Sequence, residues 1–152
     1  MEAVRELSED IRGVLGQTFL SRFDYLLDLR GRRIMVGTQS EEGLRAEMDI
    51  STGRPTVFTS LGRLVIDSGS DRLVVFDAGS GGGGNILRTS TGLVSARIAN
   101  GRRLLIEGRE IRHTGAVSIV TPGGSRGEDG LLPAAAFNAI YFCHSKGYVV
   151  FQ

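Results

Sequence analysis

The sequence contains very few of the cysteine and histidine residues that metal and redox sites use. Cys143 is the only cysteine in 152 residues, so no disulfide can form within the chain and no pair of cysteines exists to bind zinc. The two histidines, His113 and His144, form no cluster of metal ligands. We therefore expect neither a metal site nor another cofactor.

An excess of one charge and long hydrophobic runs are absent as well. Lys and Arg total 18 against 17 Asp and Glu, a balance that creates no field to attract nucleic acid or an anionic membrane. No run reaches the roughly eighteen apolar residues of a membrane-spanning helix. Residues 1–6 lack the basic and then apolar pattern of a secretory leader. We expect no nucleic-acid and no membrane partner, and the cellular location stays open.

The chain is rich in glycine and in short apolar segments. It contains 22 glycines and only 3 prolines, which indicates many turns in a domain of ordinary size. From residue 44 onward, β-branched and apolar segments alternate with turn residues, a pattern typical of a mainly β fold. The predicted strands there are Arg45–Ile50, Thr56–Thr59, Leu64–Asp67, Leu73–Phe76, Ile86–Thr89, Leu93–Ile98, Leu104–Glu107 and Ala116–Val120.

The N-terminal part differs from the rest in its pattern. Helical signals extend from about Leu7, and a helix is expected near Thr18–Asp24. A hairpin of Tyr25–Leu29 and Arg33–Val36 follows, with a glycine in its turn. The polar segment Gly37–Gly43 is the best candidate linker, so we divide the chain into residues 1–43, an N-terminal helix and hairpin, and residues 44–152.

Two segments of the chain share one plan. Residues 14–25 align with residues 131–142, with Gly16 over Pro133. Each copy has an apolar pair, a short helix and an aromatic-led strand. We predict a helix over Ala134–Ile140 from its alanine content, and a closing hairpin of Tyr141–His144 and Tyr148–Phe151. Such a repeat indicates two copies of one lobe, of which the first is represented only by its tail.

Asp67 lies between two apolar segments, Leu64–Ile66 and Leu73–Phe76. An ionisable carboxyl next to buried strands is costly unless it is hydrogen-bonded. Asp67-Ser68-Gly69 is either a simple hairpin turn or a turn that presents a catalytic carboxylate. Serine or cysteine catalysis is disfavoured, because Ser68 lacks a Gly-x-Ser-x-Gly context and the strand neighbours Cys143 and His144 point to opposite faces.

Asp67-Ser68-Gly69 after an apolar strand, followed about sixty residues later by Gly130-Leu131-Leu132, resembles the retropepsin-like aspartic proteases. Residues 14–28 also resemble the C-terminal signature of that family. The resemblance covers residues 45–152 as a full lobe and 13–37 as a partial one. It implies a closed-barrel-like acid protease lobe with short helices, in which residues 1–43 form the tail of a first lobe.

The resemblance also implies an activity, the hydrolysis of extended peptides by a water molecule that two aspartates activate. Asp67 would come from each of two lobes, in a homodimer or with a missing first lobe, and Ser68 and Gly69 would support it. The flap over the substrate is expected at Ser90-Thr91-Gly92, with the Gly79–Asn85 loop as a rival, and Gly130-Leu131-Leu132 would be the lobe motif.

The sequence departs from the family in two respects. Pro133 and the order Gly130-Leu131-Leu132 differ from the usual apolar-apolar-Gly, and the long N-terminal tail is foreign to a simple retropepsin protomer. Two alternatives therefore stay open. The chain is a non-catalytic β-rich binding or assembly module in which Asp67 caps a turn, or it is the inactive C-terminal half of a longer, duplicated protease.

Overall fold

The computed structural model describes residues 13–77, 85–89, 92–99, 101–120 and 127–152, and this part of the chain is mainly β, as the sequence predicts. The helical elements are α2, Gln17–Leu20, and the short 3-10 helix η1, Ala134–Ala136. The strands are β1 Tyr25–Asp28, β2 Arg33–Val36, β3 Leu44–Glu47, β4 Thr56–Thr59, β5 Gly62–Asp67, β6 Leu73–Asp77, β7 Asn85–Thr89, β8 Gly92–Ile98, β9 Leu104–Ile106, β10 Arg109–Ile111, β11 Ala116–Val120, β12 Gly130–Pro133, β13 Ala139–Cys143 and β14 Tyr148–Phe151.

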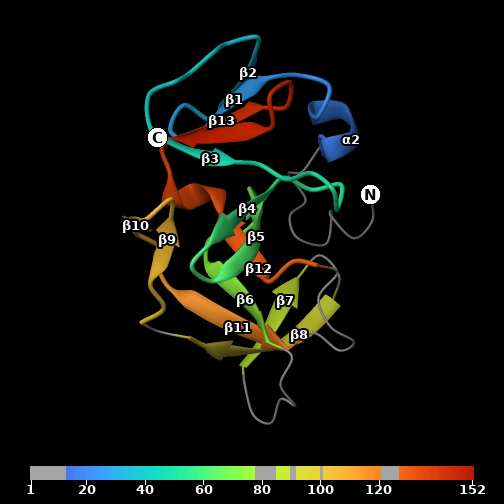
Figure 1. The fold of residues 1–152 in the computed structure, drawn as a ribbon. Helices are drawn as coiled ribbons and strands as arrows, with labels where there is room; N and C mark the ends of the chain where they lie inside the picture. The colour runs from blue at the N-terminus through green and yellow to red at the C-terminus, as the bar shows by residue number, and fades with distance from the viewer. Residues whose placement is uncertain (1–12, 78–84, 90–91, 100, 121–126) are drawn as a thin grey trace.

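A five-stranded antiparallel sheet in the order β2-β1-β13-β14-β3 forms one end of the molecule (Figure 1). Its first two strands are the hairpin predicted near the N-terminus. Its next two are the closing hairpin of the chain. Residues 25–36 and 139–151 therefore share one sheet, although a hundred residues of sequence separate them.

A seven-stranded mixed sheet, in the order β4-β5-β12-β6-β11-β8-β7, forms the other large element. Strand β12 comes from late in the sequence and lies between β5 and β6 (Figure 1). It is parallel to β5 and antiparallel to β6. The strands β9 and β10 form a separate small hairpin sheet. The insertion of β12 brings Gly130–Pro133 beside the strand that ends in Asp67.

The main hydrophobic core contains residues from both large sheets. Leu64, Leu73 and Leu132 come from the seven-stranded sheet, and Phe142 and Val149 come from the five-stranded sheet. Both faces of β13 and β14 are buried, because Tyr141, Tyr148 and Val150 pack into a second cluster on the opposite face. This two-sided burial explains why the closing hairpin is almost continuously apolar.

Two sequence predictions of the fold need correction. No sheet of the described residues closes into a barrel, since β4 and β7 are open edges of one large sheet and β2 and β3 of the other. The helix predicted over Ala134–Ile140 is limited to the three residues of η1. Ala139 and Ile140 are strand residues because they pair with β1 on one side, and Ile140 pairs with Phe151 on the other. This tertiary pairing outweighs helix propensity.

The predicted N-terminal helix is shorter than expected where it is described. Helix α2 ends at Leu20, and the chain turns before β1 begins at Tyr25. Residues 1–12, which the sequence assigns partly to helix, lie outside the described residues. No helix of the described part is both long and apolar enough to cross a membrane.

Candidate active site around Asp67

Asp67 is the last residue of β5 and lies opposite Pro133 of β12 in the parallel register. The three residues before it, Leu64–Ile66, are buried, and β6 begins with buried Leu73 after a short turn. Asp67 itself is partly exposed. The carboxyl thus stands where a buried strand reaches the surface, as the flanking apolar sequence predicts.

One carboxylate oxygen of Asp67 is held by the backbone. The N–H of Gly69 donates a hydrogen bond to Oδ1 over 2.8 Å, and an added Cβ at Gly69 would lie 3.3 Å from the same oxygen. Oδ2 accepts no hydrogen bond from any described residue. Ser68 is exposed, and its hydroxyl makes no hydrogen bond within the described chain. Of the two predicted supporting residues, Gly69 therefore donates a hydrogen bond to Asp67, and the supporting role of Ser68 stays a prediction.

Two hydrogen bonds hold the rest of the turn, one within it and one from the segment before β11. Ser70 Oγ donates to the carbonyl oxygen of Arg72 over 2.7 Å, and Thr114 Oγ1 donates to the carbonyl oxygen of Asp71 over 2.9 Å. The ion pair of Asp71 and Arg72 is long, at 4.0 Å, and both side chains are mostly exposed. Because exposed pairs contribute only about 0–1 kcal/mol, the backbone contacts position the turn.

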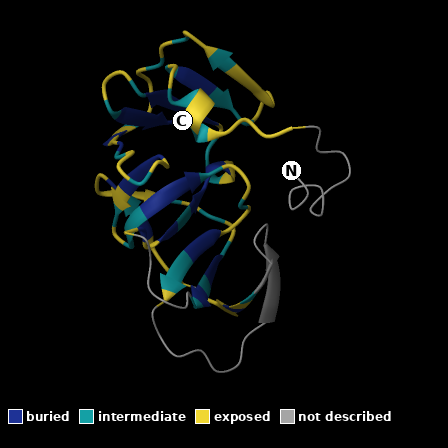
Figure 2. Cartoon of the chain, turned by 90° about the vertical axis from the view of Figure 1, so that its right-hand side faces the viewer, coloured by how far each residue is buried: buried dark blue, intermediate teal, exposed yellow. Residues whose placement is uncertain are grey.

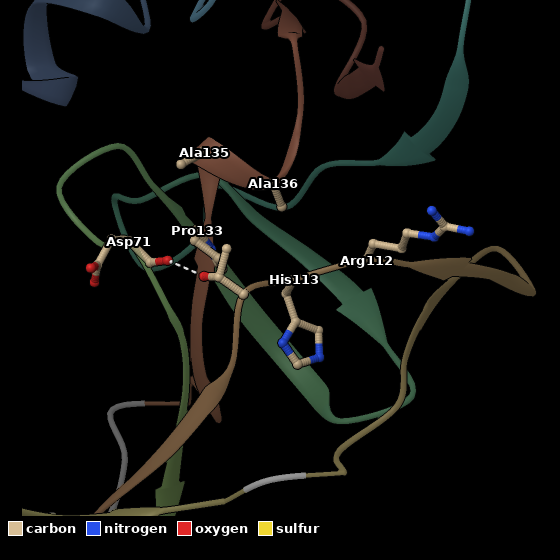
Figure 3. A pocket seen from close by; sticks show the side chains of 7 residues that line it. Asp71, Arg112, His113, Pro133, Ala135 and Ala136 are labelled. Carbon is tan, nitrogen blue, oxygen red and sulfur yellow. Dashed lines mark hydrogen bonds between the residues drawn. The ribbon is translucent and has the colours of Figure 1, made fainter.

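A cavity of about 330 Å³ opens beside this turn (Figure 3). Its lining residues are Asp71, Arg112, His113, Thr114, Pro133, Ala135 and Ala136. His113 Nε2 lies 2.9 Å from the carbonyl oxygen of Arg102, and its buried Nδ1 has no hydrogen-bond partner among the described residues. Asp67 does not line the cavity, which adjoins its turn through Asp71 and its pairing partner Pro133.

The predicted lobe motif, Gly130-Leu131-Leu132, forms most of β12, and each of its residues pairs with β5, opposite Leu64, Val65 and Ile66 in turn. Leu132 is fully buried. Gly130 lies so close to β6 that an added Cβ would be 2.0 Å from the carbonyl oxygen of Val74. The structure therefore brings together the two motifs that are separated in sequence.

The predicted flap is described only in part. Strands β7 and β8 form a hairpin in which Gly92, the first residue of β8, pairs with Thr89. Ser90 and Thr91 lie outside the described residues, and so does the rival loop except for Asn85, the first residue of β7. The hairpin adjoins β11 through β8.

Sequence reasoning missed the polar contacts that hold the segment before β12. Glu128 is buried, and Arg54 donates to both of its carboxylate oxygens, with 3.0 Å from Nε to Oε1. Next to it, Asp129 Oδ2 accepts a hydrogen bond from the N–H of Arg63 over 2.8 Å. The partners are far apart in sequence, and no local pattern relates them.

A second polar cluster joins the N-terminal segment to the closing hairpin. Asp24 accepts hydrogen bonds from Ser145 N at 2.9 Å and Ser145 Oγ at 2.5 Å, and Cys143 Sγ lies 3.6 Å away. Burial raises the pKa of Asp24, but these hydrogen bonds and one from the His144 backbone outweigh it and leave the pKa below its usual value. These contacts join the residue before β1 to the turn between β13 and β14.

Cys143 and His144 do not form a nucleophile and base. Cys143 is buried, with its sulfur near Asp24, whereas the His144 ring stacks on Tyr25 and Phe142. Burial lowers the pKa of His144, and the Asp24 carboxylate only partly opposes that effect. Ser145 contacts Asp24 directly, without an imidazole between them. No group of three potential metal ligands occurs in the described part of the chain.

Comparison of the chain with models of protein families, with curated proteins and with solved structures gives no match.

Proposed function

We propose that this chain is a lobe of an aspartic endopeptidase, in which Asp67 shares a proton and a water molecule with an aspartate from a second lobe. The observation that carries the proposal is the parallel pairing of β5 with β12. It sets the strand that ends in Asp67 beside the Gly130-Leu131-Leu132 motif, the combination on which the resemblance to retropepsin-like proteases rests. The resemblance rests on sequence motifs alone, so the activity must be tested at the site itself.

The chemistry follows from the closeness of two carboxyl groups. Two adjacent carboxylates cannot both be ionised, so one remains protonated while the other is charged. The charged carboxylate takes a proton from water, and the protonated one polarises the carbonyl of the peptide bond. The N–H of Gly69 donates a hydrogen bond to Oδ1 of Asp67, and no described residue donates to Oδ2. Oδ2 is therefore the oxygen that would bind the water molecule or the shared proton.

One chain supplies only one of the two aspartates, so activity requires a partner that supplies the second. Asp67 of a second copy would face Asp67 across a two-fold axis, as such symmetry requires. A separate first lobe with its own acidic turn is the other source. Activity that rises more than linearly with protein concentration indicates that the second aspartate is Asp67 of a second copy.

The test is hydrolysis of an unfolded protein substrate between about pH 4 and 7, where paired carboxyl groups can act. Asp67→Asn should abolish the activity. Asp71→Asn is the matched control, because it makes the same change in the same turn at an exposed side chain and should retain the activity. Absence of Asp67-dependent hydrolysis, both from this chain and from the two-lobed form described below, contradicts the proposal.

A non-catalytic β-rich binding module is the second candidate, and one contact favours it. The bond from Gly69 N–H to Oδ1 of Asp67 spans two residues, which is the geometry of an aspartate that caps a turn. In that case Asp67→Ala should lower stability by about 1 kcal/mol, the usual value of such a hydrogen bond. No variant of the chain would then show hydrolysis that depends on Asp67.

A further inference from the structure

The hairpins that follow the two repeat segments form a local two-fold arrangement in the five-stranded sheet. Leu26 pairs with Tyr141 at its centre, and Tyr25–Phe142 and Leu27–Ile140 are the pairs on either side. Asp28 and Arg33 flank the turn of one hairpin, as Cys143 and Tyr148 flank the turn of the other. A half-turn about the central pair therefore exchanges β1 with β13 and β2 with β14. This half-turn places Tyr25 over Ile140, two residues away from Phe142, with which the sequence repeat aligns it.

The two halves of this arrangement differ at their outer edges. On one side, β3 pairs with the outer edge of β14, from Tyr148 opposite Glu47 to Phe151 opposite Leu44. On the other side, β2 is the edge of the sheet, and no described strand pairs with its outer side. The half that contains β2 thus lacks the counterpart of β3.

The core face of the sheet is covered over one half only. Directly paired residues lie on one face, so Val36, Tyr25, Phe142 and Val149 form one row, and Ile34, Leu27, Ile140 and Phe151 form the next. The half-turn exchanges these rows.

Exposure within the two rows is unequal. Val149 and Phe151 are 0% and 3% exposed beneath the lobe, whereas their counterparts Ile34 and Val36 are 40% and 57% exposed. The same core face therefore continues beyond the lobe that covers it.

The segment before the hairpin shows the same asymmetry. Leu132 is buried in β12 with 0% exposure, and its repeat counterpart Leu15 is 59% exposed. A Cβ added at Gly130 would lie 2.0 Å from Val74 O, whereas a Cβ added at Gly13 would have no atom of another described residue within 4 Å, apart from its chain neighbours. Residues 13–16, which correspond to β12, are exposed throughout and lead into α2 (Figure 2).

Two further exposed apolar side chains of the N-terminal segment are aromatic. Phe19 and Phe23 are in contact, with ring centroids 5.3 Å apart, and both are exposed. We use the name tail surface for the exposed apolar side chains of residues 13–36, which are Val14, Leu15, Phe19, Phe23, Ile34 and Val36. An apolar surface of this kind on a soluble domain marks an interaction site.

We infer that the tail surface binds a second β lobe with the plan of residues 44–130, one that lacks a closing hairpin of its own. Residues 13–16 would enter that lobe as its β12, α2 would take the place of η1, and β1 and β2 would close its core. The surface argument is independent of catalysis. Only the expectation that this lobe carries an acidic turn facing Asp67 rests on the proposed function.

A second copy of the chain does not fit the tail surface. Its own lobe is already closed by its β13, β14 and β3, so its core face has no room for another hairpin. The partner is therefore a lobe without these strands, and the tail supplies what it lacks.

A two-lobed tandem chain tests the inference. Residues 44–130 are joined directly to Val14 of a chain that continues to residue 152, so that residue 130 leads into Val14 as it normally leads into Leu131. A second version joins the same segment to residue 1 of the full chain through a Gly/Ser linker. Val36→Cys is made in both tandems and in the 152-residue chain, and its labelling by a maleimide is timed under native conditions.

Labelling of Cys at position 36 should be slowed roughly tenfold or more in the tandems relative to the 152-residue chain, because covered sites react only on local opening. Phe58→Cys, on β4 of the C-terminal lobe, is the control and should label equally in all forms, since Phe58 is 61% exposed. The native Cys143 is buried and gives a low background.

Several results overturn the inference. Equal labelling at position 36 in all forms does so, and so does failure of both tandems to fold. Protection in the 152-residue chain that grows with its concentration would identify a second copy as the occupant. Protection of position 36 without peptide hydrolysis supports the binding of a second lobe to the tail surface and contradicts the proposed protease activity. Asp67-dependent hydrolysis with an unprotected position 36 supports the protease activity and contradicts the binding of a lobe to the tail surface.

Discussion

Replacement of Gly130 by alanine tests whether β12 is wedged between β5 and β6. An added Cβ would lie 2.0 Å from Val74 O, 2.9 Å from Leu64 Cδ2 and 3.1 Å from Val74 C. The first contact is with the backbone of a paired strand, which cannot rotate away as a flexible side chain could. Strand β12 must therefore move by about an ångström, and its hydrogen bonds to β6 must lengthen.

The expected loss of stability follows from these contacts. Overpacking of a well-packed core costs about 1–3 kcal/mol, and each weakened hydrogen bond adds about 0.5–1.5 kcal/mol. Gly130→Ala should lower the free energy of unfolding by about 3 kcal/mol. In a chain of this size that corresponds to a fall in Tm of roughly 6–12 °C.

Urea unfolding followed by circular dichroism measures the change, and an unchanged m-value shows that the unfolded state is not altered. Gly13→Ala is the matched control, because neither glycine has a positive φ and a Cβ added at Gly13 would have no atom of another described residue within 4 Å, apart from its chain neighbours. It should be neutral, or stabilising by up to about 1 kcal/mol through the unfolded chain. Equal effects of the two substitutions would refute the wedge.

Two further predictions concern the polar contacts. Arg54→Ala should destabilise the chain by about 2–3 kcal/mol, because it leaves the carboxylate of Glu128 buried without its partner, and addition of Glu128→Gln should recover part of the loss in a double-mutant cycle by urea unfolding. A Glu128→Gln single variant that costs more than Arg54→Ala contradicts this reasoning. Burial lowers the pKa of His144 in the folded chain, so as the pH falls the imidazole is protonated in the unfolded chain before it is protonated in the folded chain. The free energy of unfolding should therefore fall as the pH drops through about 6.5. His144→Phe keeps an aromatic ring beside Tyr25 and should reduce the change of Tm between pH 7 and 5. If Tm changes with pH as much in this variant as in the original chain, His144 is not the cause of the pH dependence.

The local patterns of the sequence determined most of the strands and their order along the chain. Alternating and β-branched segments predicted β4, β5, β6 and β11, and the glycine turns predicted both hairpins. These features depend on neighbours in sequence, where turn chemistry and side-chain alternation act directly. Asp67 as the end of a buried strand was predictable for the same reason.

Tertiary structure decided the features that depend on distant residues. Ala139 and Ile140 have helical neighbours in sequence but become strand, because β1 and β14 supply hydrogen-bond partners on either side. The pairing of Glu128 with Arg54, and the insertion of β12 between β5 and β6, join residues that no local pattern relates.

The repeat shows the division most clearly. The sequence alone determined that residues 14–25 and 131–142 share a plan. Only the tertiary structure decided that β1 and β13 meet at Leu26 and Tyr141, and that Leu132 is buried while its repeat counterpart Leu15 is exposed. The physical reason is that burial depends on which surfaces are brought together in space, and identical local patterns can be covered in one place and open in another.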